Sequence, residues 1–182
     1  MPKWQVKWIF VGFRTIFGEA ASGLESGLKS RVNLGLKFYN MIEQEYITKR
    51  DRLFKSIANC SFASYNFYHS GVDELTYEAG LSVELELNKL HMHRQAEFPI
   101  YYKGIASKVK RRMDVVVEDP ELGFVVCELK AVERVGEVHR TQLWSYMKLM
   151  NIHLGMLINF SPKGVYYESY ELNEETGKCD RV

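Results

Sequence analysis

Hydrophobic and polar positions follow two different periods along most of the chain. Apolar residues recur at helical spacing in three segments: residues 50–68, 74–90 and 137–150. Runs of β-branched and aromatic residues predict strands at residues 98–102, 113–118, 124–130 and 154–160. A further strand at residues 165–172 is left open. Asp73 is placed to cap the second helix. The order helix, helix, three strands, helix, strand predicts one α/β (α+β) domain.

The first 49 residues have a different character. Lys3, Lys7 and Arg14 precede the first acidic residue, Glu19, and stand among aromatic and aliphatic side chains. Such a segment is typical either of a targeting presequence or membrane-surface helix, or of an extra helix packed on the domain. Gly- and Ser-rich residues 18–36 predict a flexible or weakly helical connector.

These patterns give three expected parts of the chain. Residues 1–49 form an N-terminal extension of uncertain structure, and residues 50–172 form the folded domain. Residues 173–182 remain as a C-terminal tail.

The hairpin formed by the second and third strands carries the most informative pattern. Symmetric pairing about its five-residue turn places Asp114 opposite Glu128 and Arg112 opposite Lys130. Alternation then collects the apolar side chains on the other face: Met113, Val115, Val117, Val125, Cys127 and Leu129. The apolar face is expected in the core. The charged face opposes acid to acid and base to base, which is unfavourable for directly facing residues.

Two interpretations of this charged face stay open. Two close carboxylates either share a proton or bind a cation, and a hard divalent ion prefers carboxylate and carbonyl oxygens. Asp114 and Glu128 can supply two ligands and the Leu129 carbonyl a third, with Lys130 placed to orient water or stabilise charge on a phosphate. Alternatively, diagonal salt bridges join Asp114 to Lys130 and Arg112 to Glu128 on a solvated surface.

Composition adds constraints rather than a function. The chain has 182 residues with 24 Lys and Arg against 23 Asp and Glu, so nucleic-acid binding requires a local basic patch. The run Lys108, Lys110, Arg111 and Arg112 is such a patch, unless it is only a solvated loop. Three widely spaced cysteines disfavour a disulfide framework or a structural zinc site and favour a reducing compartment. No apolar stretch is long enough for a membrane-spanning helix.

Six short motifs resemble the GxxExxY proteins, a branch of the PD-(D/E)XK nuclease superfamily. They occur in that family's order over about residues 50–163: Gly71-Val-Asp-Glu74-Leu-Thr-Tyr77 followed by Gln95, Tyr102-Lys-Gly104, Arg112-Met-Asp114, Glu128-Leu-Lys130, Gln142-Leu-Trp-Ser-Tyr146 and the strand at 154–160. The sequence before the first motif, Tyr68-His-Ser-Gly71, departs from the usual Leu-Gly-Pro-Gly, and residues 1–49 have no counterpart in the family pattern.

The resemblance implies a restriction-endonuclease-like core with a mixed central sheet flanked by helices. It also implies phosphodiester hydrolysis that depends on Mg²⁺ or Mn²⁺, with Asp114 and Glu128 as metal carboxylates and Lys130 as the catalytic lysine. Glu74 resembles the additional acid of RecB-like nucleases, which often reaches metal through water. Gln142 and Tyr146 resemble the QxxxY element of that branch, in which Gln142 meets DNA or a metal-bound water and Tyr146 supports Lys130.

The function expected from the sequence is therefore a metal-dependent nuclease acting on DNA, with RNA as an alternative substrate. The alternative class is a non-catalytic nucleic-acid-binding or protein-interaction module that retains the nuclease fold. A homodimer or a protein partner is left open. An intracellular, cytoplasmic location is expected, although the basic N-terminus leaves an organelle open as a destination.

Overall fold

The computed structural model describes residues 26–182, so the targeting or packing helix considered for the N-terminus lies outside the described residues. The chain divides into two compact units, Met1–Asp51 and Arg52–Val182. Helix α2 (Ser26–Tyr68) has 43 residues, and it includes residues 26–36, which the sequence had suggested as a flexible or weakly helical connector. Within the described part of the chain, no helix is long and apolar enough to cross a membrane.

The second unit is built around a six-stranded sheet with strand order β1-β2-β3-β4-β5-β6. After α2 the elements are α3 (Glu74–Leu87), β1 (His91–Tyr102), β2 (Ile105–Asp119), β3 (Gly123–Lys130), α4 (Glu137–Met150), β4 (Leu154–Ser161), β5 (Gly164–Asn173) and β6 (Lys178–Arg181). The β3–β4 pair is parallel and the other neighbouring pairs are antiparallel. Helix α4 provides the crossover that parallel neighbours need. The sheet is therefore mixed, as the sequence resemblance implied.

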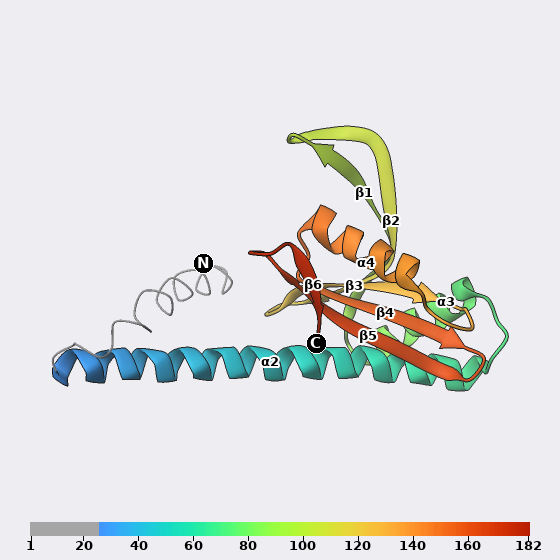
Figure 1. The fold of residues 1–182 in the computed structure, drawn as a ribbon. Helices are drawn as coiled ribbons and strands as arrows, with labels where there is room; N and C mark the ends of the chain where they lie inside the picture. Colours follow the sequence, from blue (N-terminus) through green and yellow to red (C-terminus); the bar gives the residue numbers. More distant parts are fainter. Residues whose placement is uncertain (1–25) are drawn as a thin grey trace. The chain divides into compact units, whose positions relative to one another are not determined.

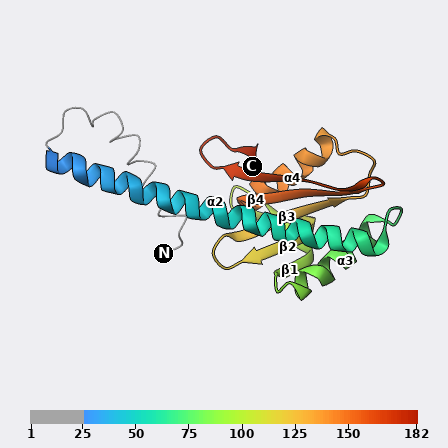
Figure 2. The same cartoon turned by 90° about the horizontal axis from the view of Figure 1, so that it is seen from below.

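Helices cover both faces of the sheet (Figure 2). One apolar cluster joins the C-terminal part of α2 and helix α3 to inward side chains of β2, β3 and β4, including Ile57, Leu81, Val115 and Cys127. A second cluster joins α4 to the opposite face through Leu143 and other side chains. Because both faces are covered, all eight residues of β4 are buried.

The hairpin register follows the symmetric pairing predicted from the sequence. Val115 pairs with Cys127 and Val116 with Val126, and the ladder continues to the turn. The predicted cap is also present, because Asp73 Oδ1 accepts a hydrogen bond of 2.8 Å from the Thr76 backbone N–H.

The first hairpin is much longer than the sequence suggested. β1 begins at residue 91 rather than 98, and β2 begins at residue 105 rather than 113. The N-terminal part of β2 pairs only with β1, so residues 97–112 form a two-stranded arm that rises from the sheet in Figure 1. Residues 178–181, expected in a tail, form the edge strand β6, and the fifth strand left open at residues 165–172 is present as β5.

A close approach between α2 and α3 makes Gly80 a point of tight packing. A Cβ atom built there would lie 2.4 Å from Ser64 Oγ and 2.7 Å from Tyr68 Cε2, whereas one at Gly35, also helical, would meet nothing within 4 Å. We expect Gly80→Ala to lower the free energy of unfolding by about 1 kcal/mol, since overpacking outweighs the gain in helix propensity. Gly35→Ala is the matched control and should leave stability unchanged or raise it. Equal changes in the melting temperatures of the two variants would contradict this account.

Candidate active site

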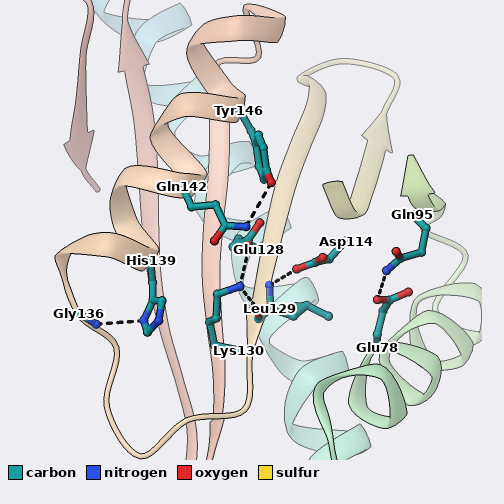
Figure 3. A network of polar contacts seen from close by, with 10 residues as sticks. All are labelled: Glu78, Gln95, Asp114, Glu128, Leu129, Lys130, Gly136, His139, Gln142 and Tyr146. Atoms are coloured by element: carbon teal, nitrogen blue, oxygen red, sulfur yellow. Dashed lines mark hydrogen bonds and ion pairs between the residues drawn. The ribbon is translucent and has the colours of Figure 1, made fainter. Parts of the chain in front are cut away.

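The predicted site lies where β2 and β3 separate, beside helix α4 (Figure 3). Asp114 comes from β2, and Glu128 and Lys130 come from the last three residues of β3. Glu74 is the first residue of α3, next to the cap at Asp73. Three elements therefore contribute charged side chains to this region.

Strand β2 changes faces at Asp114. Met113 packs in the apolar cluster under α4, whereas Val115 packs in the cluster under α2 and α3. Regular alternation would keep these two side chains on one face, so the predicted grouping of Met113 with the other apolar hairpin residues is wrong. Across the β1–β2 ladder, Gln95 has a φ of +50° and Asp114 has no paired partner. The left-handed backbone of Gln95 thus coincides with the break in alternation.

The carboxylate of Asp114 spans the gap that opens between the two strands. The β2–β3 ladder ends at the pair Val115–Cys127. Immediately beyond it, Asp114 Oδ2 accepts a hydrogen bond of 2.9 Å from the Leu129 backbone N–H. The Asp114 carboxylate therefore takes the place of a backbone carbonyl as the acceptor, and this hydrogen bond holds Asp114 against β3.

The two basic side chains predicted to face each other across the hairpin, Arg112 and Lys130, do not do so. Arg112 lies opposite Glu97 of β1 rather than opposite Lys130. Lys130 makes its ion pair with Glu128 in its own strand. Among the ion pairs of residues 26–182, neither of the diagonal salt bridges considered from the sequence, Asp114–Lys130 and Arg112–Glu128, occurs.

Glu128 is a buried carboxylate with one satisfied and one unsatisfied oxygen. Its side chain is 1% exposed, and Oε1 accepts a hydrogen bond of 2.5 Å from Lys130 Nζ. The same Nζ donates to the Leu129 carbonyl at 2.9 Å. Glu128 Oε2 is buried without a hydrogen-bond partner. A buried oxygen of this kind is costly unless another group satisfies it.

The electrostatics of the site favour the neutral forms of Glu74 and Glu128. Burial raises the pKa of Glu128 to about 7, with the charge of Asp114 adding to the rise and Lys130 opposing it. Burial also raises the pKa of Glu74, against the pull of Lys130. Burial disfavours the charged form of Lys130, but the hydrogen bond to Glu128 and the nearby acids outweigh it and raise the pKa of Lys130.

The charge of Asp114 is close enough to contribute to the raised pKa values of Glu74, Glu128 and Lys130, so the four side chains form one electrostatic group. They do not form a closed ligand set, because no three His, Cys, Asp or Glu side chains in residues 26–182 are arranged to hold a metal ion. The donor chemistry still fits a hard divalent cation, which prefers carboxylate and carbonyl oxygens. The unpartnered Glu128 Oε2 is an oxygen at which such a cation would satisfy a buried charge.

The two α4 residues of the predicted site contact each other. Gln142 Nε2 donates a hydrogen bond of 3.2 Å to the Tyr146 hydroxyl. The ring of Tyr146 also packs edge to face on Phe98 at the root of the arm, with centroids 5.9 Å apart. The resemblance implied that Tyr146 supports Lys130, whereas its hydrogen bond instead holds Gln142 beside the site (Figure 3).

Sequence reasoning missed the part played by Glu78. This residue is 2% exposed and forms an ion pair of 3.0 Å with Arg94. Its carboxylate also accepts a hydrogen bond from Gln95 Nε2, the residue whose left-handed backbone lies across from Asp114. Glu78 follows Glu74 by one helical turn, which is the signal that places both on one face of α3.

The predicted nucleic-acid-binding residues lie in strand β2 rather than in a loop. Lys108, Lys110, Arg111 and Arg112 all belong to the exposed arm. Lys110 Nζ forms an ion pair of 3.0 Å with Glu97 across the arm, and the side chains of both residues are more than half exposed.

A mixed sheet between helices, with acidic residues and a lysine where its central hairpin opens, defines a restriction-endonuclease-like fold. A family model described as the PD-(D/E)XK nuclease superfamily matches residues 51–169. Because this match spans more than half of the sequence, the chain belongs to the PD-(D/E)XK nuclease superfamily.

Comparison with solved structures finds similarity to one described as the crystal structure of SSO0001. The two chains share 23% identity with a TM-score of 0.40, over 54% of this chain and 51% of that one. This chain thus spans about half the length of that structure. A comparison with curated proteins finds no match.

The raised pKa of Glu128 predicts a cost to stability in the metal-free protein. In the folded state Glu128 holds its proton up to a pH of about 7, whereas an unfolded glutamate loses it near its ordinary pKa of about 4.3. The folded state therefore binds more protons between these pH values, and stability falls as the pH rises through them. We expect Glu128→Gln to flatten this slope and to raise the free energy of unfolding at pH 8 by roughly 1–3 kcal/mol.

The measurement is thermal unfolding in EDTA between pH 5 and pH 8. Glu86→Gln is a matched control, because Glu86 is an exposed glutamate on α3. An unchanged or lower melting temperature for Glu128→Gln at pH 8 would show that the buried carboxylate does not destabilise the fold.

Proposed function

We propose that the chain is a divalent-metal-dependent nuclease that hydrolyses phosphodiester bonds in DNA, with RNA as the alternative substrate. The observation that carries the proposal is the unpartnered buried Oε2 of Glu128, beside Asp114 and Lys130. A buried carboxylate oxygen without a partner is retained at a cost, which a bound cation would remove. Membership of the PD-(D/E)XK nuclease superfamily supports the same conclusion.

Mg²⁺ or Mn²⁺ would be held by Asp114, Glu128 and the Leu129 carbonyl, with Glu74 acting as an additional acid. When bound, such an ion supplies Lewis-acid activation of water and neutralises negative charge on the phosphate. Lys130 contributes an ammonium group that its acidic neighbours keep protonated. A fixed cation of this kind stabilises charge that develops on a phosphate oxygen.

Gln142 and Tyr146 act together in this proposal. The Gln142 amide would hydrogen-bond to DNA or to a metal-bound water. The Tyr146 hydroxyl, which accepts a hydrogen bond from Gln142 Nε2, orients that amide. The Gly71–Tyr77 motif, Glu128-Leu-Lys130 and the QxxxY spacing support a finer placement in the GxxExxY family of the RecB-like branch.

We further propose that the catalytic domain begins at about residue 50 after an extension at residues 1–49, and that it continues past the predicted boundary at residue 172 to include the edge strand β6. An intracellular, cytoplasmic location is part of the proposal. Its support is that Cys60, Cys127 and Cys179 are all free thiols. A homodimer or a protein partner completing the substrate path remains an additional hypothesis, without a described interface.

Asp114→Asn is expected to remove both metal binding and cleavage. Loss of the carboxylate charge removes one of the proposed ligands, so cleavage should fall by about 100-fold or more. The measurement is calorimetric titration with Mn²⁺ and Mg²⁺, together with cleavage of fluorescent single- and double-stranded DNA and RNA. Metal binding by the wild type without cleavage of any substrate would favour the non-catalytic module, and no metal binding would mean that the acids are structural.

Lys130→Ala separates catalysis from metal binding. The lysine ammonium already contacts Glu128 Oε1 and the Leu129 carbonyl, two of the proposed ligand atoms. Its removal should abolish cleavage while leaving metal affinity equal or higher. Lys163→Ala, an exposed lysine in the β4–β5 turn, is the matched control. Metal binding that disappears together with cleavage in Lys130→Ala would contradict the assigned roles.

Tyr146→Phe tests the orientation of Gln142. The substitution keeps the ring packed on Phe98 and removes only the hydroxyl that accepts the Gln142 hydrogen bond. We expect cleavage to fall by about 3- to 10-fold, the value of one neutral hydrogen bond, with an unchanged Kd for Mn²⁺. A larger loss in Tyr146→Phe than in Gln142→Ala would show that Tyr146 acts independently of Gln142.

A further inference from the structure

The arm formed by residues 97–112 has a charge unlike that of the rest of the chain. Residues 97–112 contain five Lys or Arg residues and one acidic residue, Glu97, although the whole chain has a net charge of only +1. The remainder of the chain is therefore net negative. A basic element on a chain of this kind creates a local attraction for polyanions that the molecule as a whole does not have.

The tip of the arm is a tight turn that exposes two aromatic rings. Lys103 and Gly104 have φ values of +51° and +79°, which is typical of a two-residue type I′ turn. Tyr101 and Tyr102 are 59% and 71% exposed, and Ile105 is 74% exposed. Exposed aromatic and aliphatic side chains grouped in this way at a tip indicate a contact surface.

The two tyrosines point to opposite faces of the arm. Tyr102 pairs with Ile105 and Tyr101 pairs with Ala106, so the ladder is regular at the tip and neighbouring side chains alternate. Each face of the tip therefore presents one ring. Lys103 Nζ lies 5.5 Å from the centre of the Tyr102 ring, which adds a positive charge to that face.

The stem of the arm carries the basic side chains. Lys110 and Arg112 share one face, because they pair with Pro99 and Glu97 in a regular ladder. Between this stem and the tip, the pairing register of β1 and β2 shifts. Lys108 lies in the part of β2 where the shift occurs. At the root, Phe98 is buried against Tyr146 of the proposed active site.

We propose that this arm binds single-stranded nucleic acid: the stem contacts phosphates, and unpaired bases stack on Tyr101 and Tyr102. This inference rests on the proposed nuclease function and narrows its substrate. Aromatic rings beside basic side chains are the combination that binds single strands without reading sequence. Reading base edges in a duplex groove relies on Arg, Lys, Asn or Gln side chains at the contact, whereas the contact surface of this tip is mainly two rings and an isoleucine, with Lys103 beside the Tyr102 ring.

The test measures binding in EDTA, where cleavage does not interfere, by fluorescence anisotropy with a 20-nucleotide single strand and the matching duplex. The double variant Tyr101→Ala/Tyr102→Ala should weaken single-strand binding by about 10-fold or more, since it removes both rings on which bases would stack. Duplex binding should change less than about twofold, because paired bases do not present their faces. The double variant Tyr101→Phe/Tyr102→Phe should restore single-strand affinity, since stacking uses the ring and not the hydroxyl.

Controls separate the tip from the stem. Tyr166→Ala removes a tyrosine of β5 that is 69% exposed, and it should leave both affinities unchanged. Lys108→Ala/Arg112→Ala should weaken both substrates and reduce the salt dependence of binding by about one unit of slope per residue. Lys178→Ala in β6 is the matched basic control.

The outcomes distinguish this inference from the proposed function. Suppose that the wild type cleaves nucleic acid. If the alanine tip variant then binds single strands as tightly as the wild type, or loses affinity for single strand and duplex equally, the inference is wrong and the proposed nuclease function stands. If single-strand binding depends on the tip but no substrate is cleaved with Mg²⁺ or Mn²⁺, the arm is correctly assigned and the nuclease is wrong. A wild type that binds neither oligonucleotide overturns the inference directly.

Discussion

The separation of β2 from β3 at Asp114 is the constraint on which the rest of the site depends. The backbone ladder stops at Val115, and the next link between the strands is the hydrogen bond from the Leu129 N–H to the Asp114 carboxylate. That bond fixes an acidic side chain without a regular strand pair. It also frees the N-terminal part of β2 to pair with β1 alone, so the same break positions a carboxylate and starts the arm.

The charges gathered at this break are in conflict in the metal-free protein. Burial and the neighbouring acid push the pKa of Glu128 upward, and Lys130 compensates only one of its oxygens. Replacing such a group with a neutral one would make the fold more stable, which is the usual relation between a destabilised site and its activity. The chain therefore keeps an unfavourable arrangement where a cation would relieve it.

The sequence predicted those features that depend on local patterns. Symmetric pairing about the five-residue turn predicted the register of the β2–β3 hairpin, and Asp73 marked the start of α3. It could not predict the long arm, because residues 91–97 are mostly polar and an exposed edge strand needs no apolar alternation. The burial of Glu78 depends on Arg94, sixteen residues away in the sequence, and such a tertiary partner has no local signature. The change of faces at Asp114 coincides with the left-handed backbone of Gln95. No glycine stands next to Gln95 in the sequence, so nothing there predicted this conformation.

The contact between Phe98 and Tyr146 divides the arm into a constrained part and a free part. Phe98 is buried against the Tyr146 ring, whose hydroxyl accepts the Gln142 hydrogen bond, so the root of the arm packs beside the candidate site. Past Pro99 the register shifts, and the residues of the tip are exposed and make no such packing contact. The part of the hairpin beyond Pro99 can therefore change without disturbing the packed root at Phe98. Its length and composition can diverge between related proteins or be exchanged by design, whereas Phe98 is held by its contact with the Tyr146 ring.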